Sequence, residues 1–192
     1  MKLEKIVVAS GNANKIREIK QIFSNAEIIP MQSLGFDGDI PETGETFKQN
    51  AEIKAKFIAE KFCVPALADD SGLCVDALGG APGVYSARFS GGGDEENRRL
   101  LLKKLENENN RSAHFTSAVC LYLPDGTKYF GEGETHGQIL FKDTGSNGFG
   151  YDCIFYSDDL KKSFGIASAE EKNKVSHRYR ALCDLAAKLK KD

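Results

Sequence analysis

The sequence predicts an α/β fold with a mixed β-sheet, and three observations support this prediction. Short apolar runs alternate with segments of helical periodicity through the first 70 residues. Two long runs around Pro124-Asp125-Gly126 are typical of a β-hairpin, which requires antiparallel pairing. The 192 residues are enough for one domain, or for two lobes that share a core.

The first part of the chain is predicted to alternate strands with helices. Pro65 follows the second helix as a stop signal, and either Thr43 or Thr46 could cap that helix at its start. The expected elements are strand 5–9, a helix with apolar positions from Ile16 to Phe23, strand 27–31, a loop over 35–44, a helix ending near Phe62, and strand 66–68. The last of these strands would place Asp69 and Asp70 at its C-terminal end.

The second part of the chain contains the hairpin and two further helices. Glycines indicate loops at 79–83 and 90–93. The expected elements are helix 98–106, hairpin strands 113–123 and 127–132, strand 154–156, and a last helix capped by Ser176. No internal repeat and no interdomain linker is visible, so residues 1–192 are predicted to form a single domain.

The charge and the cysteine content narrow the classes of function. A formal net charge of −2 gives no broad attraction to nucleic acid or to an anionic membrane, so an anionic ligand would need a local pocket or a metal. The five cysteines form no C-x-x-C pair and favour neither a zinc site nor a disulfide framework. No segment approaches the roughly 20 apolar residues that span a bilayer. A reducing cytoplasmic setting is expected.

A glycine-containing turn joins the first strand to the first helix and could bind phosphate. Such a turn presents backbone N–H groups at a helix N-terminus, and Lys15 adds a positive charge. The turn has neither the P-loop pattern nor the dinucleotide-binding glycine pattern, so a plain connection is the alternative interpretation. The candidate phosphate-binding residues are Ser10, Gly11, Asn12, Ala13, Asn14 and Lys15.

Acidic and basic side chains gather near the second helix. If that helix forms, Thr46, Asn50 and Lys54 are spaced i, i+4 and i+8 and share one face. Glu42 lies just ahead of this face. A solvated helix side is the plainer interpretation of the spacing, unless another segment brings carboxylates to the same place.

The segment Asp69-Asp70-Ser71-Gly72 could bring those carboxylates. Adjacent acids at the end of a strand lie where α/β proteins commonly build ligand sites. Mg²⁺ takes oxygen ligands, and it often reaches a protein through one or two carboxylates plus substrate phosphates. An Asx turn is an equally good interpretation of the same four residues.

A third candidate is the aromatic loop Gly148-Phe149-Gly150-Tyr151-Asp152, whose ring could stack on a nucleobase. A structural aromatic anchor is the alternative. His177 lies at the start of the last helix beside Arg178. No His/Cys/carboxylate cluster has zinc spacing, and Ser71 lacks the G-x-S-x-G turn of hydrolase nucleophiles.

Together these motifs resemble the inosine/xanthosine triphosphate pyrophosphatase family, which removes non-standard purine nucleotides. The motifs come in family order and span almost the whole chain. They are Ser10-Gly11-Asn12 with Lys15, Glu42-Thr43-Gly44 with Phe47, Asn50 and Lys54, Ala68 to Leu73, Leu78 to Arg88, Gly148 to Asp152, Glu171-Lys172 and Ser176-His177-Arg178. The resemblance implies an elongated two-lobed fold with an active-site cleft between the lobes, usually as a homodimer. It also implies cleavage of ITP, dITP or XTP to the monophosphate and pyrophosphate.

The resemblance further implies roles for single residues. Glu42 and Asp70 would hold Mg²⁺, and Asp70 would help to activate the attacking water. Lys54 would assist the phosphate-binding turn, and Asp69 would lie behind the metal or bridge to it. Ser71 would touch the substrate. A pocket for a purine with a 6-keto group would be formed by Phe149, Gly150, Tyr151, Asp152, Lys172, His177 and Arg178.

Two departures from the family pattern are present. Cys153 stands where proline is frequent, and Pro41 stands where some members carry a second acid, which leaves the number of metal-binding carboxylates open. The alternatives are a pyrophosphatase for modified pyrimidine nucleotides and a catalytically silent nucleotide-binding module. Nucleic-acid binding is the weakest alternative, because no aromatic-basic stripe supports it.

Overall fold

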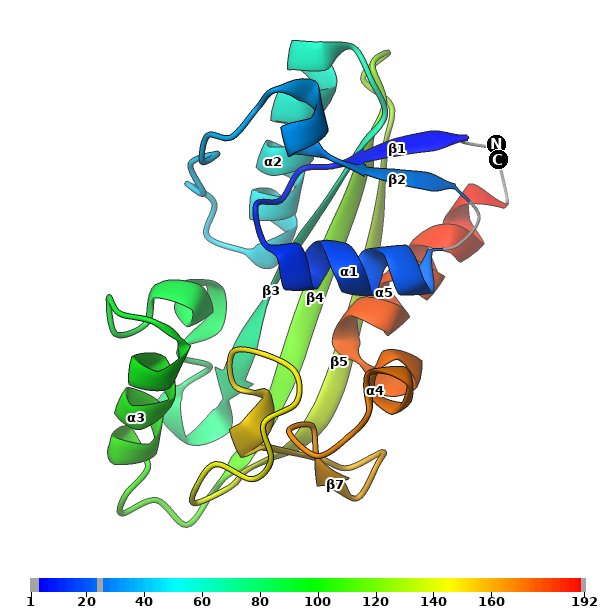
Figure 1. Ribbon diagram of the computed structural model, residues 1–192. Coiled ribbons are helices and arrows are strands. Elements are labelled where there is room, and N and C mark those ends of the chain that lie inside the picture. The colour runs from blue at the N-terminus through cyan, green and yellow to red at the C-terminus, as the bar shows by residue number, and fades with distance from the viewer. Residues whose placement is uncertain (1–3, 24–25, 191–192) are drawn as a thin grey trace. The chain divides into compact units, whose positions relative to one another are not determined.

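The computed structural model describes residues 4–23 and 26–190, and it confirms an α/β fold with a mixed sheet. Within those residues the strand order is β2-β1-β3-β4-β5-β6-β7 (Figure 1). β1 pairs in parallel with β2 and β3, whereas β6 pairs antiparallel with β5 and β7. The strands are β1 (Lys5–Val8), β2 (Glu27–Pro30), β3 (Ala66–Val75), β4 (Ser112–Tyr122), β5 (Lys128–Ile139), β6 (Phe155–Ser157) and β7 (Lys162–Ser163).

Helices connect most of these strands. The α-helices are α1 (Ala13–Ile22), α2 (Phe47–Phe62), α3 (Asp94–Lys104), α4 (Ala169–Val175) and α5 (His177–Leu189). Short 3₁₀ helices are η1 (Met31–Leu34), η2 (Asp76–Leu78), η3 (Gly83–Arg88) and η4 (Asp152–Ile154). In the part of the chain that the structure describes, no helix combines the length and the apolar character needed to cross a bilayer.

The chain divides into two compact units. Unit 1 contains the chain up to Asp70, Ser117–Gly133, and the chain from Arg178 onward. Unit 2 contains Ser71–Thr116 and Glu134–His177. The strands β3, β4 and β5 each contribute residues to both units, because three of the unit boundaries fall within these strands, and the fourth falls at the start of α5.

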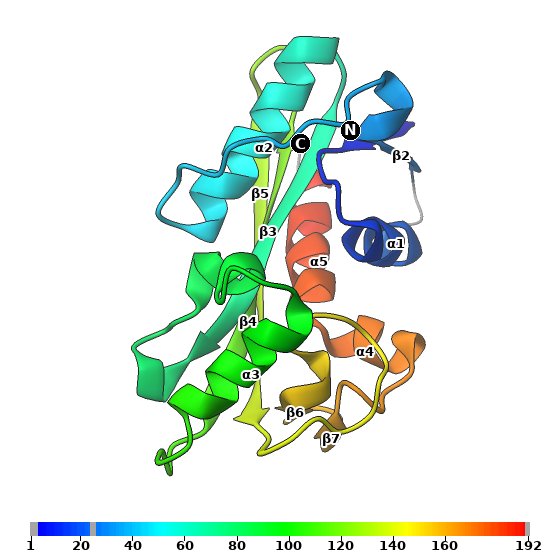
Figure 2. The ribbon, with the colours of Figure 1, turned by 60° about the vertical axis from the view of Figure 1, so that its left-hand side comes forward.

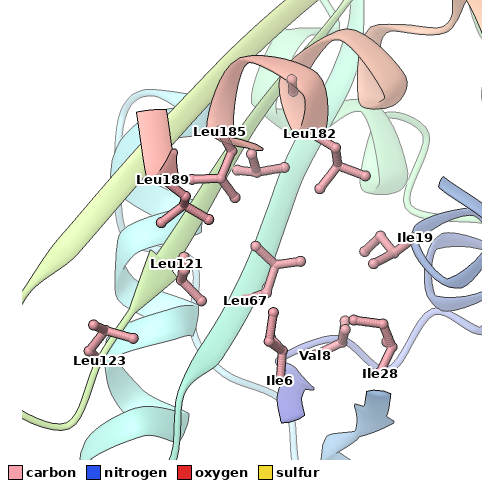
Figure 3. Packing of buried hydrophobic residues seen from close by; sticks show 12 residues of the cluster. Ile6, Val8, Ile19, Ile28, Leu67, Leu121, Leu123, Leu182, Leu185 and Leu189 are labelled. Carbon is pink, nitrogen blue, oxygen red and sulfur yellow. The ribbon is translucent and has the colours of Figure 1, made fainter. Parts of the chain in front are cut away.

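In unit 1, successive residues of β1 and β3 point to opposite layers of helices, as the alternation of a strand requires. Ile6, Val8 and Leu67 pack with apolar residues of α1 and α5 (Figure 3). Val7 and Ala66 pack on the other side, with apolar residues of α2. Figure 2 shows α2 on one side of these strands and α1 with α5 on the other.

Unit 2 has a separate apolar core built around aromatic rings. The ring centroid of Phe155 lies 4.7 Å from that of Phe115 and 5.1 Å from that of Phe164. Leu101 of α3 and Leu73 of β3 are fully buried in the same cluster. This core supports the loop that contains Phe149.

Local capping signals set where the helices begin. The Thr46 hydroxyl accepts a hydrogen bond from the backbone N–H of Gln49 at 3.2 Å, and the Gln49 side chain accepts one from the backbone N–H of Thr46 at 3.2 Å. This capping box confirms Thr46, and not Thr43, as the start of α2. A box of the same kind, between Ser168 and Glu171, begins α4, which the sequence interpretation missed.

Three predicted boundaries were wrong. Strand β3 does not end at residue 68: it continues to Val75, so Asp69 and Asp70 lie inside a strand and do not form an Asx turn. Helix α3 begins at Asp94 and not at Arg98, because the Glu96 carboxylate accepts from the Gly93 backbone N–H at 3.0 Å. The second hairpin strand runs to Ile139, seven residues beyond the predicted end at 132.

Candidate active site

The turn before α1 is held by its own polar side chains. Asn12 caps the helix, since its Oδ1 accepts from the backbone N–H groups of Asn14 at 2.9 Å and Lys15 at 3.1 Å. The Ser10 hydroxyl accepts from the Asn12 N–H at 3.1 Å. Gly11, Asn12 and Ala13 are exposed. The turn is therefore ordered by these bonds and open to a ligand in solution.

Lys15 extends from this turn toward β3. Its Nζ lies 2.9 Å from Oδ2 of Asp69 and 3.4 Å from the backbone oxygen of the same residue. The ammonium group thus joins the predicted phosphate-binding turn to the predicted acidic motif, two segments 54 residues apart in the chain.

A second lysine joins two more of the predicted residues. Lys54 Nζ donates to Glu42 Oε1 at 2.7 Å, to Asp70 Oδ1 at 2.9 Å and to the backbone oxygen of Asp69 at 3.1 Å. Burial by itself would lower the pKa of Lys54, but the charges of Asp70 and then Glu42 outweigh burial and raise it. Lys54 is buried, so the helix face predicted from the spacing is not simply a solvated side.

Glu42 is held in place by the start of α2. The Asn50 Oδ1 accepts from the Gly44 backbone N–H at 2.8 Å, which fastens the segment before the helix onto the helix. A Cβ atom at Gly44 would lie 2.6 Å from the Gln49 Cβ, so only glycine fits this close approach. Thr46, Asn50 and Lys54 therefore act on the same side of α2, as the spacing predicts.

Asp70 keeps one carboxylate oxygen available. Its Oδ2 is buried and has no hydrogen-bond partner within residues 4–23 and 26–190. Burial raises the pKa of this carboxyl, and Glu42 adds to the increase, while Lys54 and Lys15 oppose it. A buried acceptor without a donor costs free energy, and a cation or a water proton would satisfy it.

This cluster suits Mg²⁺ better than a softer metal. Glu42 and Asp70 offer only oxygen, and Mg²⁺ commonly uses one or two carboxylates together with water and phosphate. The described ranges contain no group of three or more His, Cys, Asp or Glu residues that could hold a metal ion. An ion bound here would take its remaining ligands from water and from a phosphate-bearing substrate.

Asp69, in contrast, is fully engaged. Its Oδ1 accepts from the Ser117 hydroxyl at 2.5 Å, and its Oδ2 contacts Lys15 and Arg178. Burial would raise the pKa of Asp69, but the charges of Arg178 and Lys15, with the bond from Ser117, hold it well below its usual range. Asp69 is therefore a buried anion that ties three segments together, and none of its side chain is exposed.

Arg178 lies in unit 1, between two carboxylates. Its Nη2 is 3.1 Å from Asp69 Oδ2, and its Nη1 bonds to Glu18 of α1. Both carboxylates raise its pKa against the effect of burial, and its side chain is fully buried. Its predicted role toward a purine base stays a prediction. Sequence reasoning missed its partner Glu18, and also Ser117, because neither belongs to a recognisable motif.

In unit 2, the aromatic loop is closed around Asp152. Its Oδ2 accepts from the Lys172 ammonium at 2.7 Å and from the backbone N–H of Phe149 at 2.8 Å. The same ammonium lies 4.8 Å from the centroid of the Phe149 ring. Gly148 has a φ of +78°, and a Cβ there would lie 2.1 Å from Asp152 Oδ2, so the loop depends on glycine at this position.

The other predicted residues of this loop have structural partners. The Tyr151 hydroxyl donates to the Ser86 backbone oxygen at 2.8 Å, and Gly150 donates its N–H to Asp94 at 2.8 Å. The His177 ring is buried and stacks on Phe115, with centroids 4.8 Å apart and planes at 14°. Ser71 is half-buried on β3. The half-buried Phe149 ring and the Lys172 ammonium are the features of this group best suited to a flat, polar ligand.

Comparisons with known proteins agree on one family. A model of the Ham1 family matches residues 6–188. The dITP/XTP pyrophosphatase of Streptomyces avermitilis is 42% identical over 191 residues, with 95% of this chain and 96% of the relative covered. The dITP/XTP pyrophosphatase of Haemophilus influenzae is 43% identical over 194 residues, with 97% and 99% covered.

Solved structures give the same result. The Ham1 protein of Staphylococcus aureus is similar with a TM-score of 0.88 and 41% identity, and the match covers 98% of this chain and 99% of that one. A HAM1 protein from Coxiella burnetii has a TM-score of 0.88 and 36% identity, with 98% and 100% covered.

Proposed function

Since the chain belongs to the Ham1 family, we propose that it hydrolyses the non-standard purine triphosphates ITP, dITP and XTP, releasing the monophosphate and pyrophosphate, with Mg²⁺ as its cofactor. The observation that carries the proposal is the cluster of Glu42, Lys54 and Asp70, in which a buried carboxylate oxygen of Asp70 has no donor among the described residues. The relatives named dITP/XTP pyrophosphatase support the choice of substrate.

The residues of unit 1 account for the hydrolytic step. Glu42 and Asp70 would hold Mg²⁺, and the ion would supply the positive charge that neutralises phosphate oxygens. The turn from Ser10 to Lys15 binds the triphosphate through backbone N–H groups and the Lys15 ammonium. The carboxylate of Asp70 orients a water molecule toward the α-phosphorus and accepts its proton. Lys15 and Lys54 stabilise the negative charge that develops on the departing pyrophosphate.

Asp69 contributes as a positioning residue in this scheme. Its carboxylate fixes Lys15 at 2.9 Å, and its backbone oxygen accepts from Lys54 at 3.1 Å. Both lysines therefore keep a defined direction before substrate arrives. Charge positioned in this way needs no further rearrangement during the chemical step, once the triphosphate is bound.

The residues of unit 2 recognise the base. The Phe149 ring supplies a stacking surface, and the Lys172 ammonium, which donates to Asp152 at 2.7 Å and lies 4.8 Å from the centroid of that ring, is the donor proposed for a 6-keto oxygen. Adenine presents an amino group at that position and would leave the donor unpaired, at a cost of about 1–3 kcal/mol. The predicted pocket also includes Ser71, Gly150, Tyr151, His177 and Arg178.

The proposal extends to the setting of the enzyme. We propose a cytoplasmic homodimer that acts on free nucleotides and not on nucleic acid. The net charge of −2 supports the choice of free nucleotides over nucleic acid, because it offers no general attraction to a polyanion.

Incubation with Mg²⁺ and a panel of triphosphates, followed by separation of the products, tests the function. We expect monophosphate and pyrophosphate from ITP, dITP and XTP, with little product from ATP or GTP. A nucleoside diphosphate with orthophosphate would contradict the bond assignment, and preferential turnover of modified pyrimidine triphosphates would contradict the base assignment.

The substitution Asp70→Asn tests the assigned centre. We expect a loss of turnover of at least about 10²-fold, because both a metal ligand and the proton acceptor are removed. Asp125→Asn makes the same chemical change in the exposed hairpin turn and should leave turnover unaltered. Near-normal kcat in Asp70→Asn would remove Asp70 from its role.

A further inference from the structure

Lys54 occupies the place of a bound cation. An ammonium group has three N–H donors, and the three acceptors around Lys54 Nζ are Glu42 Oε1 at 2.7 Å, Asp70 Oδ1 at 2.9 Å and the Asp69 backbone oxygen at 3.1 Å. The side chain is 11% exposed. All its donors are thus used on oxygens of the kind that Mg²⁺ prefers.

The charges in this cluster are nearly balanced without a metal. Two carboxylates and one ammonium leave a net charge of −1, and Lys15 approaches from the Asp69 side. A divalent ion entering the cluster would meet a positive charge that it cannot displace into bulk water, because the lysine is tethered to α2. Charges at such short separations interact strongly where water is excluded.

We propose that Lys54 is a tethered counter-ion that keeps Glu42 and Asp70 from binding free Mg²⁺ and that yields them when a triphosphate provides new acceptors for its ammonium group. This proposal rests on the proposed function and adds to it the order in which the metal and the triphosphate bind. The nucleotide-free protein binds metal weakly, and metal and triphosphate bind together.

The buried Oδ2 of Asp70 makes this exchange possible. Because that oxygen has no donor within the described ranges, an arriving ion can contact Asp70 before Lys54 has left Oδ1. The phosphate oxygens then replace the carboxylates as partners of the ammonium group. Each charged group thus exchanges one partner for another, which matters because an uncompensated buried charge is costly.

The test measures Mn²⁺ binding to the nucleotide-free protein, with free Mn²⁺ followed by its electron paramagnetic resonance signal. Lys54→Met removes the charge and keeps the length of the side chain, and we expect it to bind Mn²⁺ at least tenfold more tightly than the unmodified protein. Lys54→Arg keeps the charge and should bind Mn²⁺ as weakly as the unmodified protein. Equal affinity in Lys54→Met and the unmodified protein would overturn the proposal.

Two controls locate the effect. Lys56→Met makes the same change on the same helix, at an exposed lysine paired with Glu60 at 3.8 Å, and should not alter Mn²⁺ affinity. The double variant Lys54→Met/Asp70→Asn should lose the gain in affinity, and a gain that persists there would place the ion elsewhere and overturn the proposal.

A stability measurement guards against misfolding. If Lys54→Met unfolds without metal, Lys54→Gln, which keeps a donor, replaces it in the same titration and decides the question by the same criterion. We also expect Mn²⁺ to raise the Tm of the neutral variants more than that of the unmodified protein. Neither measurement requires turnover, so the two proposals can fail separately. If the unmodified protein hydrolyses no triphosphate but Lys54→Met still binds Mn²⁺ more tightly, the proposed reaction is refuted and the counter-ion role of Lys54 stands.

Discussion

Arg178 donates to Asp69 across 3.1 Å, and neither side chain is exposed to solvent. The pair joins the first turn of α5 to the middle of β3, and Glu18 of α1 adds a second carboxylate to the same guanidinium. A buried ion pair does not by itself show that the protein is more stable. Removal of one partner is nevertheless costly, because the other charge then stays buried without a counter-charge.

Arg178→Met is therefore expected to destabilise the protein by about 3–5 kcal/mol, because Asp69 and Glu18 both lose their buried cation. Urea unfolding followed by circular dichroism measures the change. Arg99→Met, at an exposed arginine paired with Glu95 at 2.9 Å, should cost less than about 0.5 kcal/mol. A similar decrease in the free energy of unfolding in both variants would show that burial of the Arg178 ion pair does not add to its effect on stability.

Ser117→Ala should also destabilise unit 1, by about 1.5–3 kcal/mol, because the Ser117 hydroxyl bonds to an ionised carboxylate at 2.5 Å. The same unfolding experiment applies. Ser112→Ala, at the exposed start of the same strand, is the matched control. If Ser117→Ala is as stable as the control, Asp69 does not need this bond.

Lys15→Met should raise KM for the triphosphate by about tenfold or more, since a charge-assisted bond to phosphate contributes about 1.5–3 kcal/mol. Steady-state kinetics with ITP measures the effect. Lys20→Met, at an exposed lysine five residues further along α1, should leave KM unaltered. An unaltered KM in Lys15→Met would argue that Lys15 serves only to hold Asp69.

Phe149→Leu should raise KM for ITP by roughly tenfold, because stacking of a base on an aromatic ring is worth about 1–3 kcal/mol. Phe141→Leu is the control, because Phe141 lies in the same unit, is 79% exposed as a residue, and contacts Arg111 with its ring. Equal kinetics in the two variants would assign Phe149 to loop structure alone.

Removal of divalent ions should abolish turnover, and added Mg²⁺ should restore it, since Glu42 and Asp70 are placed to use the ion with the substrate phosphates. Dialysis against a chelator followed by the pyrophosphate-release assay provides the measurement. Full activity in the presence of excess chelator would contradict the metal requirement.

Elements with strong local signals could be predicted from the sequence. The capping threonine and the apolar stripe defined α2, and Pro124-Asp125-Gly126 defined the hairpin, whose turn closes with Gly126 donating to Leu123 at 3.0 Å. The length of β3 could not be predicted, because two acids inside a strand look like a turn until their partners are known. The partners of Asp69, which are Lys15 and Arg178, lie 54 and 109 residues away, and Lys54, the partner of Asp70, lies 16 residues away.

The candidate site shows the same limit. The spacing of Asn50 and Lys54 predicted a shared face, because i and i+4 are neighbours on any helix. That Lys54 contacts Asp70, and that Arg178 contacts Glu18, depends on how strands and helices pack, and no local pattern encodes it. Glu18 resembles any surface acid of an amphipathic helix in sequence, and yet it is buried.

Because the capping box fixes the start of α2 at Thr46, the number of residues between Thr46 and Lys54 is constrained. An α-helix turns about 100° for each residue. The eight-residue separation of Lys54 from the cap at Thr46 therefore sets the direction in which the Lys54 side chain leaves the helix. One residue inserted or deleted in that interval would rotate the ammonium away from both acids, even if every side chain in the site were kept. Apart from Gln49 and Asn50, whose side chains hold the start of α2, this stretch constrains the number of its residues more than their identity.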